Sequence, residues 1–314
     1  MTVYAWARRR RFPGLPVPED RFFQVTSDTQ VLAHCFWQRD RAAHPLLVAL
    51  HGLEGSTAAH YMRGLAAKGL QAGLNVLLLN QRNCGDTEHL GPGLYHSGLS
   101  EDADCVIREV VQSDGMRDVV VAGYSLGGNL ALKLAGDYGS TPPPWLRGVC
   151  AVSPVMDLTS CVAALERREN FIYQWNFVRG LRARMQRKNA CHPGRFDLAP
   201  LSSIRTIRGF DERYTAPFFG FGGATDYYYR ASSLRVVDRI RVPALILTAE
   251  DDPFVPSAPF RDPALTGNPN IQVVISEHGG HCGFLGDATS ASDGYWAEDR
   301  IVEFAKARTS TRER

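Results

Sequence analysis

Short apolar runs alternate with longer amphipathic stretches along most of the chain. Runs rich in valine and leucine favour buried strands, whereas apolar residues at every third or fourth position favour helices. The alternation of the two is typical of a mostly parallel sheet covered by helices. We predict about eight strands, at 22–27, 31–37, 46–50, 75–79, 118–122, 148–153, 244–248 and 271–275, the first two forming an antiparallel pair. We predict helices at 58–72, 100–113, 126–137, 256–261 and 295–307.

One long segment breaks this alternation, between the strand ending near 153 and the strand beginning at 244. A structureless loop of about 90 residues is improbable in a compact domain. We therefore predict an α/β core made of residues 21–154 and 236–314, interrupted by a helical cap at 155–235 and preceded by an N-terminal arm at 1–20.

The cap segment contains a stretch with apolar residues at helical spacing: Ile172, Trp175, Val178, Leu181 and Met185. Basic residues crowd the same stretch: Arg167, Arg168, Arg182, Arg187 and Lys188. We interpret the stretch as an amphipathic helix with a buried apolar face and a solvated basic face. The alternative is docking on an anionic lipid surface. Eight aromatic residues at 210–229 are expected to pack the cap against the core, and some could line a pocket.

Composition narrows the class of protein. A chain of 314 residues can bury a large core, and 44% hydrophobic with 22% charged residues is ordinary globular composition. The net charge of +2 argues against nucleic acid as the main partner. Seven cysteines without a Cys-x-x-Cys pair fit a reducing compartment, and no apolar run reaches the length of a membrane span. We therefore expect a cytoplasmic protein.

The N-terminal arm carries a basic cluster, Arg8 to Arg11. Proline-rich and acidic sequence follows it, whereas a signal peptide needs an apolar run there. We expect a solvated arm, with membrane or partner contact as the alternative.

The sequence GYSLGG places Ser125 between Gly123 and Gly127, after a predicted buried strand and before a predicted helix. Gly-x-Ser-x-Gly in this context is a nucleophile elbow, a sharp turn that exposes the serine hydroxyl at the carboxyl end of the sheet. The two glycines are needed because the turn leaves no room for a Cβ. A serine nucleophile also requires a base and a group that orients the base.

Candidates for both partners follow later strands, in the order serine, acid, histidine. AEDDPFVP offers three acids, of which Asp252 is preferred and Asp251 is the alternative, whereas Glu250 still lies close to the strand. HGGHCGF offers His281, with His278 as its competitor. We predict that His281 is the base and that Asp252 orients it.

Acyl transfer also requires an oxyanion hole of backbone N–H groups. Leu126, directly after the serine, should supply one. The loop HGLEGS should supply the other from Leu53, with His51 packed to shape that loop rather than to transfer a proton. No phosphate-binding motif or zinc ligand spacing accompanies these residues, so no cofactor or metal is expected.

Taken together, HGLEGS, NQRNCG, GYSLGGN, SIRTIRGFDERYTAPFFGFGGATDYYYRAS, AEDDPFVP and HGGHCGF resemble the YheT-like (AB hydrolase-4 type) branch of the α/β-hydrolase superfamily. The resemblance implies a hydrolase core with a helical cap, activity on carboxylic esters or acyl lipids, and a triad of Ser125, Asp252 and His281. One departure is Asn83, where relatives usually have glycine. It fits only if Asn83 adopts the left-handed conformation that glycine would adopt.

These features favour a serine carboxylesterase that hydrolyses acyl esters through an acyl-enzyme. The alternatives are acyl transfer to another acceptor, or hydrolysis of a thioester or phospholipid, because the same triad performs the same first half-reaction. A non-catalytic ligand-binding protein on this fold is a third hypothesis. The expected partner is a small acyl ester or lipid, and the cap is the expected site of any peripheral membrane contact.

Overall fold

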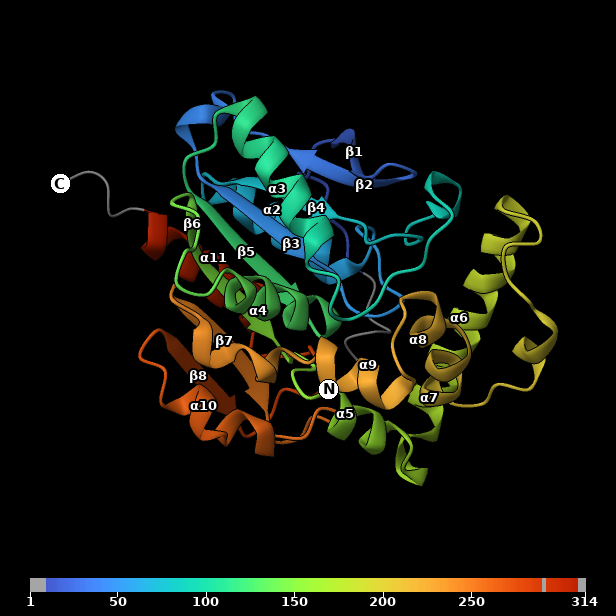
Figure 1. Cartoon of the computed structure of the whole chain (residues 1–314). Helices are drawn as coiled ribbons and strands as arrows, with labels where there is room; N and C mark the ends of the chain where they lie inside the picture. The colour runs from blue at the N-terminus through green and yellow to red at the C-terminus, as the bar shows by residue number, and fades with distance from the viewer. Residues whose placement is uncertain (1–9, 290–291, 310–314) are drawn as a thin grey trace.

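A computed structural model of the chain describes residues 10–289 and 292–309. Its centre is one eight-stranded sheet in the order β1-β2-β4-β3-β5-β6-β7-β8 (Figure 1). β1 pairs with β2 and β2 with β4 in antiparallel fashion, and the remaining neighbours are parallel. The strands are β1 (Glu19–Thr26), β2 (Thr29–Phe36), β3 (Leu46–Leu50), β4 (Asn75–Leu79), β5 (Val119–Tyr124), β6 (Leu146–Val152), β7 (Ala244–Ala249) and β8 (Ile271–Ser276). The predicted fold class is confirmed.

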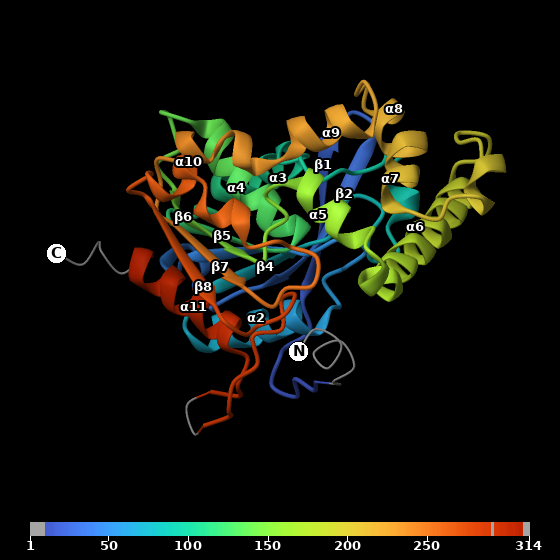
Figure 2. The ribbon, with the colours of Figure 1, turned by 90° about the horizontal axis from the view of Figure 1, so that it is seen from below.

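Helices cover both faces of this sheet (Figure 2). One face packs against α2 (His60–Gln71) and α11 (Trp296–Thr309), and the other against α3 (Glu101–Asp114), α4 (Leu126–Tyr138) and the short α10 (Pro263–Thr266). In β3, Leu46, Val48 and Leu50 point to the second face and Leu47 and Ala49 to the first. Because strand side chains alternate between faces, every position of such a central strand must be apolar.

The segment between β6 and β7 is helical. It comprises α5 (Leu158–Leu165), α6 (Phe171–Cys191), α7 (Ile207–Phe210), a π-helical turn at Asp211–Thr215, α8 (Ala216–Phe218) and α9 (Ala224–Ala231). Figures 1 and 2 both place these helices together at one end of the sheet, with α6 at the outer edge of the molecule. We call this segment the insert.

Two expectations about local structure are wrong. The predicted helix at 256–261 is only a 3-10 turn, Ala258–Arg261, because the prolines around it lack the N–H groups that an α-helix needs. The N-terminal arm is not solvated at Arg10, whose side chain is 6% exposed. Its guanidinium contacts Glu298 and Asp293 and lies 3.4 Å above the Tyr295 ring. The rest of the basic cluster up to residue 9 lies outside the described residues.

Candidate active site

Ser125 occupies the sharp turn between β5 and α4, with φ 54° and ψ −115°. A Cβ on Gly123 would lie 2.0 Å from the carbonyl oxygen of Gly127, and a Cβ on Gly127 would lie 2.2 Å from that of Leu50. Only glycine fits at either position, because the atoms in the way are backbone. The two glycines therefore permit a turn that would otherwise collide with itself and with β3.

His281 lies on the loop after β8 and reaches the serine. Its Nε2 is 2.9 Å from Oγ of Ser125, and its Nδ1 is 2.9 Å from Oδ2 of Asp252. With Nδ1–H donating to the carboxylate, Nε2 is left to accept a hydrogen bond from the hydroxyl. The other oxygen of Asp252 accepts from the N–H groups of Phe254, at 3.1 Å, and Val255, at 2.9 Å. The structure thus joins the three predicted residues in one line of hydrogen bonds.

The environment of His281 determines its charge. Burial disfavours the charged imidazolium, but Cys282 beside the ring and the charge and hydrogen bond of Asp252 together outweigh burial and raise the pKa of His281 above its ordinary value. The centres of the Phe254 ring and the imidazole ring are 4.1 Å apart, and His281 is only 5% exposed. A proton accepted from a nucleophile would be stabilised on this ring.

The competing residues have other positions. Asp251 accepts from the N–H groups of Gly279, at 2.8 Å, and Gly280, at 2.7 Å, so it fixes the loop that carries the imidazole. Glu250 binds Ser257 and Arg261 at the surface. His278 is exposed and lies 3.7 Å from Asp251. None of the three contacts the serine.

Leu53 and Leu126 both line a cavity next to Ser125. Leu126 is the first residue of α4, and N–H groups in a first helical turn have no partner within the helix. The loop of Leu53 is held by Tyr61, which accepts from Gly52 N–H at 3.2 Å, and by Tyr95, which accepts from Glu54 N–H at 3.3 Å. These neighbours fix the loop through amides other than that of Leu53.

His51 shapes the start of the same loop. Its Nδ1 lies 2.8 Å from the Gly52 carbonyl oxygen, and its Nε2 accepts a hydrogen bond from the Gln81 N–H at 3.1 Å. Burial lowers the pKa of His51 to about 4, so the ring is neutral near pH 7. The packed role predicted for His51 is confirmed.

A buried ion pair links the loop of Leu53 to the insert. Nη2 of Arg184, on α6, lies 2.5 Å from Oε1 of Glu54, and the two side chains are 7% and 16% exposed. Glu54 has a positive φ of 59°. Its carboxylate also lies against Gly180, where a Cβ would come within 2.8 Å of Oε2. The sequence pattern did not mark this pair, because Arg184 belongs to no motif and Glu54 stood out only as part of the HGLEGS loop.

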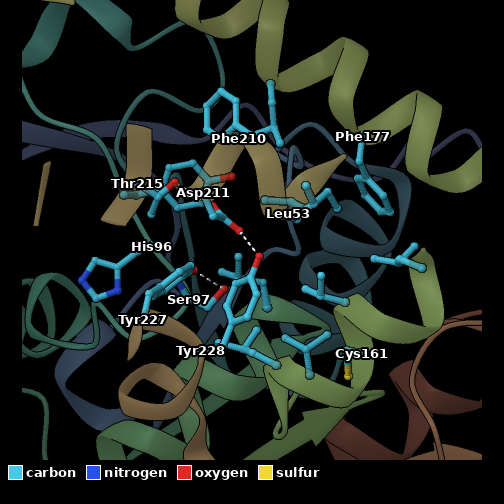
Figure 3. A pocket seen from close by; sticks show the side chains of 18 of the residues that line it. Leu53, His96, Ser97, Cys161, Phe177, Phe210, Asp211, Thr215, Tyr227 and Tyr228 are labelled. Atoms are coloured by element: carbon cyan, nitrogen blue, oxygen red, sulfur yellow. Dashed lines mark hydrogen bonds between the residues drawn. The ribbon is translucent and has the colours of Figure 1, made fainter. Parts of the chain in front are cut away.

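The cavity beside Ser125 has about 880 Å³ of empty space, part of it open to solvent. Its walls are mainly apolar and come largely from the insert: Leu158, Val162, Leu165, Phe177, Leu181, Met185 and Phe210. Figure 3 shows polar groups on the side formed by Asp211, Tyr228, Tyr227 and Ser97. Oδ1 of Asp211 accepts a hydrogen bond from the Thr215 hydroxyl at 2.7 Å. Oδ2 accepts one from the Tyr228 hydroxyl at 2.8 Å (Figure 3). Burial raises the pKa of Asp211 to about 6.

Asn83 adopts the left-handed conformation that its position requires, with φ 65°. Its amide donates to the Gly93 carbonyl oxygen at 2.9 Å and its oxygen accepts from Lys188 Nζ at 2.6 Å. The departure from glycine therefore leaves this loop ordered beside the cavity.

The predicted solvated basic face of the insert helix is wrong at one position. Lys188 is 1% exposed, and its ammonium is held by Asn83 and by the carbonyl oxygens of Glu88 and Gly91. Burial lowers the pKa of Lys188 to about 8. Arg187 pairs with the Glu88 carboxylate at 2.7 Å, but its side chain is 53% exposed, as a solvated face predicts. Both cations are used to fix the insert to the core.

The predicted apolar face is also only partly buried. Val178, Leu181 and Met185 are buried, but Ile172 is 70% and Trp175 53% exposed. Helical spacing identifies one face of a helix but does not say how much of its length contacts the core.

The described residues contain no group of three or more His, Cys, Asp or Glu side chains that could hold a metal ion. Within the same part of the chain, no helix is long and apolar enough to cross a membrane.

Comparisons with known proteins agree with this architecture. A family model described as alpha/beta hydrolase fold matches residues 45–288. The chain is 34% identical over 262 residues to the esterase-named YheT of Escherichia coli (strain K12), which covers 83% of this chain and 76% of YheT. It is 29% identical over 247 residues to the phospholipase ABHD3 of Mus musculus. This match covers 78% of this chain and about 60% of the length of that relative.

Among solved structures, the esterase Pf2001 of Pyrococcus furiosus superposes with a TM-score of 0.61 over 95% of this chain and 96% of its own, at 16% identity. At that identity the likeness concerns the fold alone. The match over most of the chain to the family model, together with the identity to YheT, shows that this protein belongs to the α/β-hydrolase fold family, in its YheT-like branch.

Proposed function

We propose that this α/β-hydrolase is a serine carboxylesterase that cleaves acyl esters through an acyl-enzyme intermediate. The observation that carries the proposal is the line of hydrogen bonds from Asp252 through His281 to Ser125, at an elbow beside an apolar cavity. The names of the relatives are consistent with it, since YheT is named as an esterase and ABHD3 as a phospholipase.

In the first half-reaction, Oγ of Ser125 attacks the ester carbonyl carbon while its proton passes to Nε2 of His281. The carbonyl oxygen becomes an oxyanion, which the N–H groups of Leu53 and Leu126 would stabilise. Losing one such donor typically costs about 10²- to 10³-fold in kcat. The tetrahedral intermediate then collapses, the C–O bond to the alcohol breaks, and His281 returns its proton to the leaving oxygen.

In the second half-reaction, a water molecule takes the place of the alcohol. His281 accepts a proton from the water, whose oxygen attacks the acyl-enzyme carbonyl. Collapse of this second intermediate returns the proton to Oγ of Ser125 and releases the carboxylic acid. Asp252 keeps Nδ1 protonated throughout, so that Nε2 stays available as the acceptor.

The cavity supports an acyl chain as the group that is recognised. Leucine, valine and phenylalanine side chains from α5 and α6 form an apolar part of its wall, and such surfaces bind hydrocarbon without needing hydrogen bonds. The polar side formed by Asp211 and Tyr228 would face the more polar end of the substrate.

The test is a panel of p-nitrophenyl esters of rising chain length, assayed with wild type, Ser125→Ala and Asp252→Asn. The proposal expects Ser125→Ala to lose essentially all activity, and Asp252→Asn to lose about 10⁴-fold by analogy with other triads. Equal rates for wild type and Ser125→Ala would refute the serine mechanism. Adding alcohols and analysing the products separates hydrolysis from acyl transfer.

A further inference from the structure

The first turns of α6 expose an unusual concentration of apolar surface. In the part of the chain that the structure describes, six large hydrophobic side chains are exposed, and three of them lie within five residues: Phe171 at 64%, Ile172 at 70% and Trp175 at 53%. Single exposed apolar residues are ordinary on soluble proteins, but a contiguous cluster marks an interaction surface. We call these three residues the apolar patch.

Arginines without acidic partners surround the apolar patch. Arg167 and Arg168 precede it in the chain, and Arg179, Arg182 and Arg205 line a surface groove together with Phe171 and Trp175. Arg179 also lies 5.1 Å from the Trp175 ring. Within the described residues, none of these five arginines forms an ion pair, whereas Arg184 and Arg187 of α6 and Arg208 of α7 all do.

Few carboxylates offset this charge. Glu169 lies in the 3-10 turn just before α6, and Glu166 pairs with Arg208 at 3.0 Å. Apolar side chains surrounded by free arginines form the pattern of a helix that lies in a membrane interface, where the rings enter the acyl boundary and the guanidinium groups meet anionic headgroups. A protein partner or a second copy of this chain would instead have to offer acidic groups to these arginines.

The opposite side of the same helix faces the cavity. Phe177, Leu181 and Met185 line the cavity beside Ser125, while Trp175 and Arg179 point into the outer groove. Figures 1 and 2 place α6 toward the outer edge of the molecule, and Phe171, Ile172 and Trp175 are exposed there. One helix therefore separates the substrate cavity from the exposed patch.

We propose that the N-terminal half of α6 docks on an anionic lipid surface through the apolar patch and its arginines. Docking brings the cavity next to a pool of acyl lipids. The docking itself stands on the surface described above, and only the supply of substrate from the membrane rests on the proposed esterase function.

The test is cosedimentation with vesicles of phosphatidylcholine alone or mixed with phosphatidylglycerol. Wild type should bind the mixed vesicles about ten-fold or more tightly than the neutral ones, and added salt should weaken binding. The triple variant Phe171→Ser, Ile172→Ser, Trp175→Ser should lose binding about ten-fold or more, as should Arg179→Gln with Arg182→Gln. The matched control changes the other three exposed apolar residues, Val17, Phe22 and Tyr229, to serine and should bind like wild type.

Soluble p-nitrophenyl acetate provides the folding control, since all three variants should hydrolyse it like wild type. Ser125→Ala should bind vesicles normally while losing hydrolysis, so failure of the docking and failure of the esterase proposal are distinguishable. Docking is overturned if wild type does not bind anionic vesicles or if the triple patch variant binds them as well as wild type does. It is also overturned if wild type is a dimer that the patch variant converts to monomer, which would assign the surface to a second copy.

Discussion

The ion pair between Arg184 and Glu54 gives a sharp prediction, because it connects the insert to the loop that carries Leu53. The perturbation is Arg184→Met, which keeps the length of the side chain and removes the cation. Removing one partner of a buried ion pair typically costs about 3–5 kcal/mol, because the other charge stays buried. Burial already raises the pKa of Glu54. Without Arg184 the carboxyl should protonate more readily, and the destabilisation should grow as pH rises through its pKa.

The largest loss of kcat expected for Arg184→Met is the loss caused by removing one N–H group from the oxyanion hole. If the loop shifts so that the Leu53 N–H no longer reaches the oxyanion, kcat should fall by up to about 10²- to 10³-fold. KM for p-nitrophenyl acetate should change much less, because its small acyl group would fill only a small part of the cavity. Arg184→Lys keeps a charge for Glu54 and should recover part of the lost kcat.

The assay measures kcat, KM and thermal unfolding for Arg184→Met, Arg184→Lys and the control Arg182→Met. Arg182 lies on the same helix and forms no ion pair among the described residues, so its variant should behave like wild type. A variant Arg184→Met that is less stable but has wild-type kcat would refute the link between the ion pair and the oxyanion loop.

Three further predictions concern the elbow and the cavity. Gly127→Ala should lower the free energy of unfolding by about 1–3 kcal/mol and abolish most esterase activity, since the new Cβ meets the Leu50 backbone. The control is Gly14→Ala, where a Cβ has open space, and a denaturant titration should give it the stability of wild type. Asp211→Asn should be more stable than wild type above pH 6, because the folded pKa of about 6 exceeds the ordinary value of 3.8 and ionisation is then penalised in the folded state. The difference in Tm should vanish near pH 4, and a constant difference would contradict this reasoning. Leu181→Trp should lower the rate on octanoate relative to acetate esters, and an unchanged ratio would remove this wall from the acyl site.

The sheet could be predicted closely because its central strands are buried on both faces. A short apolar run bounded by turn residues favours a buried strand, and the ranges predicted for β3 and β4 are the observed ones. The positions of Ser125, Asp252 and His281 followed from the order of those strands, since the carboxyl ends of parallel strands meet at one edge. Local sequence and topology thus indicated the same site.

The insert was less predictable, for a physical reason. Lys188 looks like a surface residue, yet its ammonium finds three oxygens from a loop about 100 residues earlier in the chain. Trp175 looks like a core residue, yet the core ends before reaching it. Burial of such side chains depends on long-range partners, and a single sequence does not show which loop lies opposite a given helix face.

The most direct test of the proposed mechanism is to trap the nucleophile. A fluorophosphonate reacts with an activated serine to give a stable phosphonyl adduct, and peptide mass spectrometry locates that adduct. The proposed mechanism predicts one adduct, on Ser125, with esterase activity lost in proportion to labelling and slow labelling in a His281→Ala variant. Active enzyme that stays unlabelled at Ser125, or full labelling with undiminished ester hydrolysis, would contradict it.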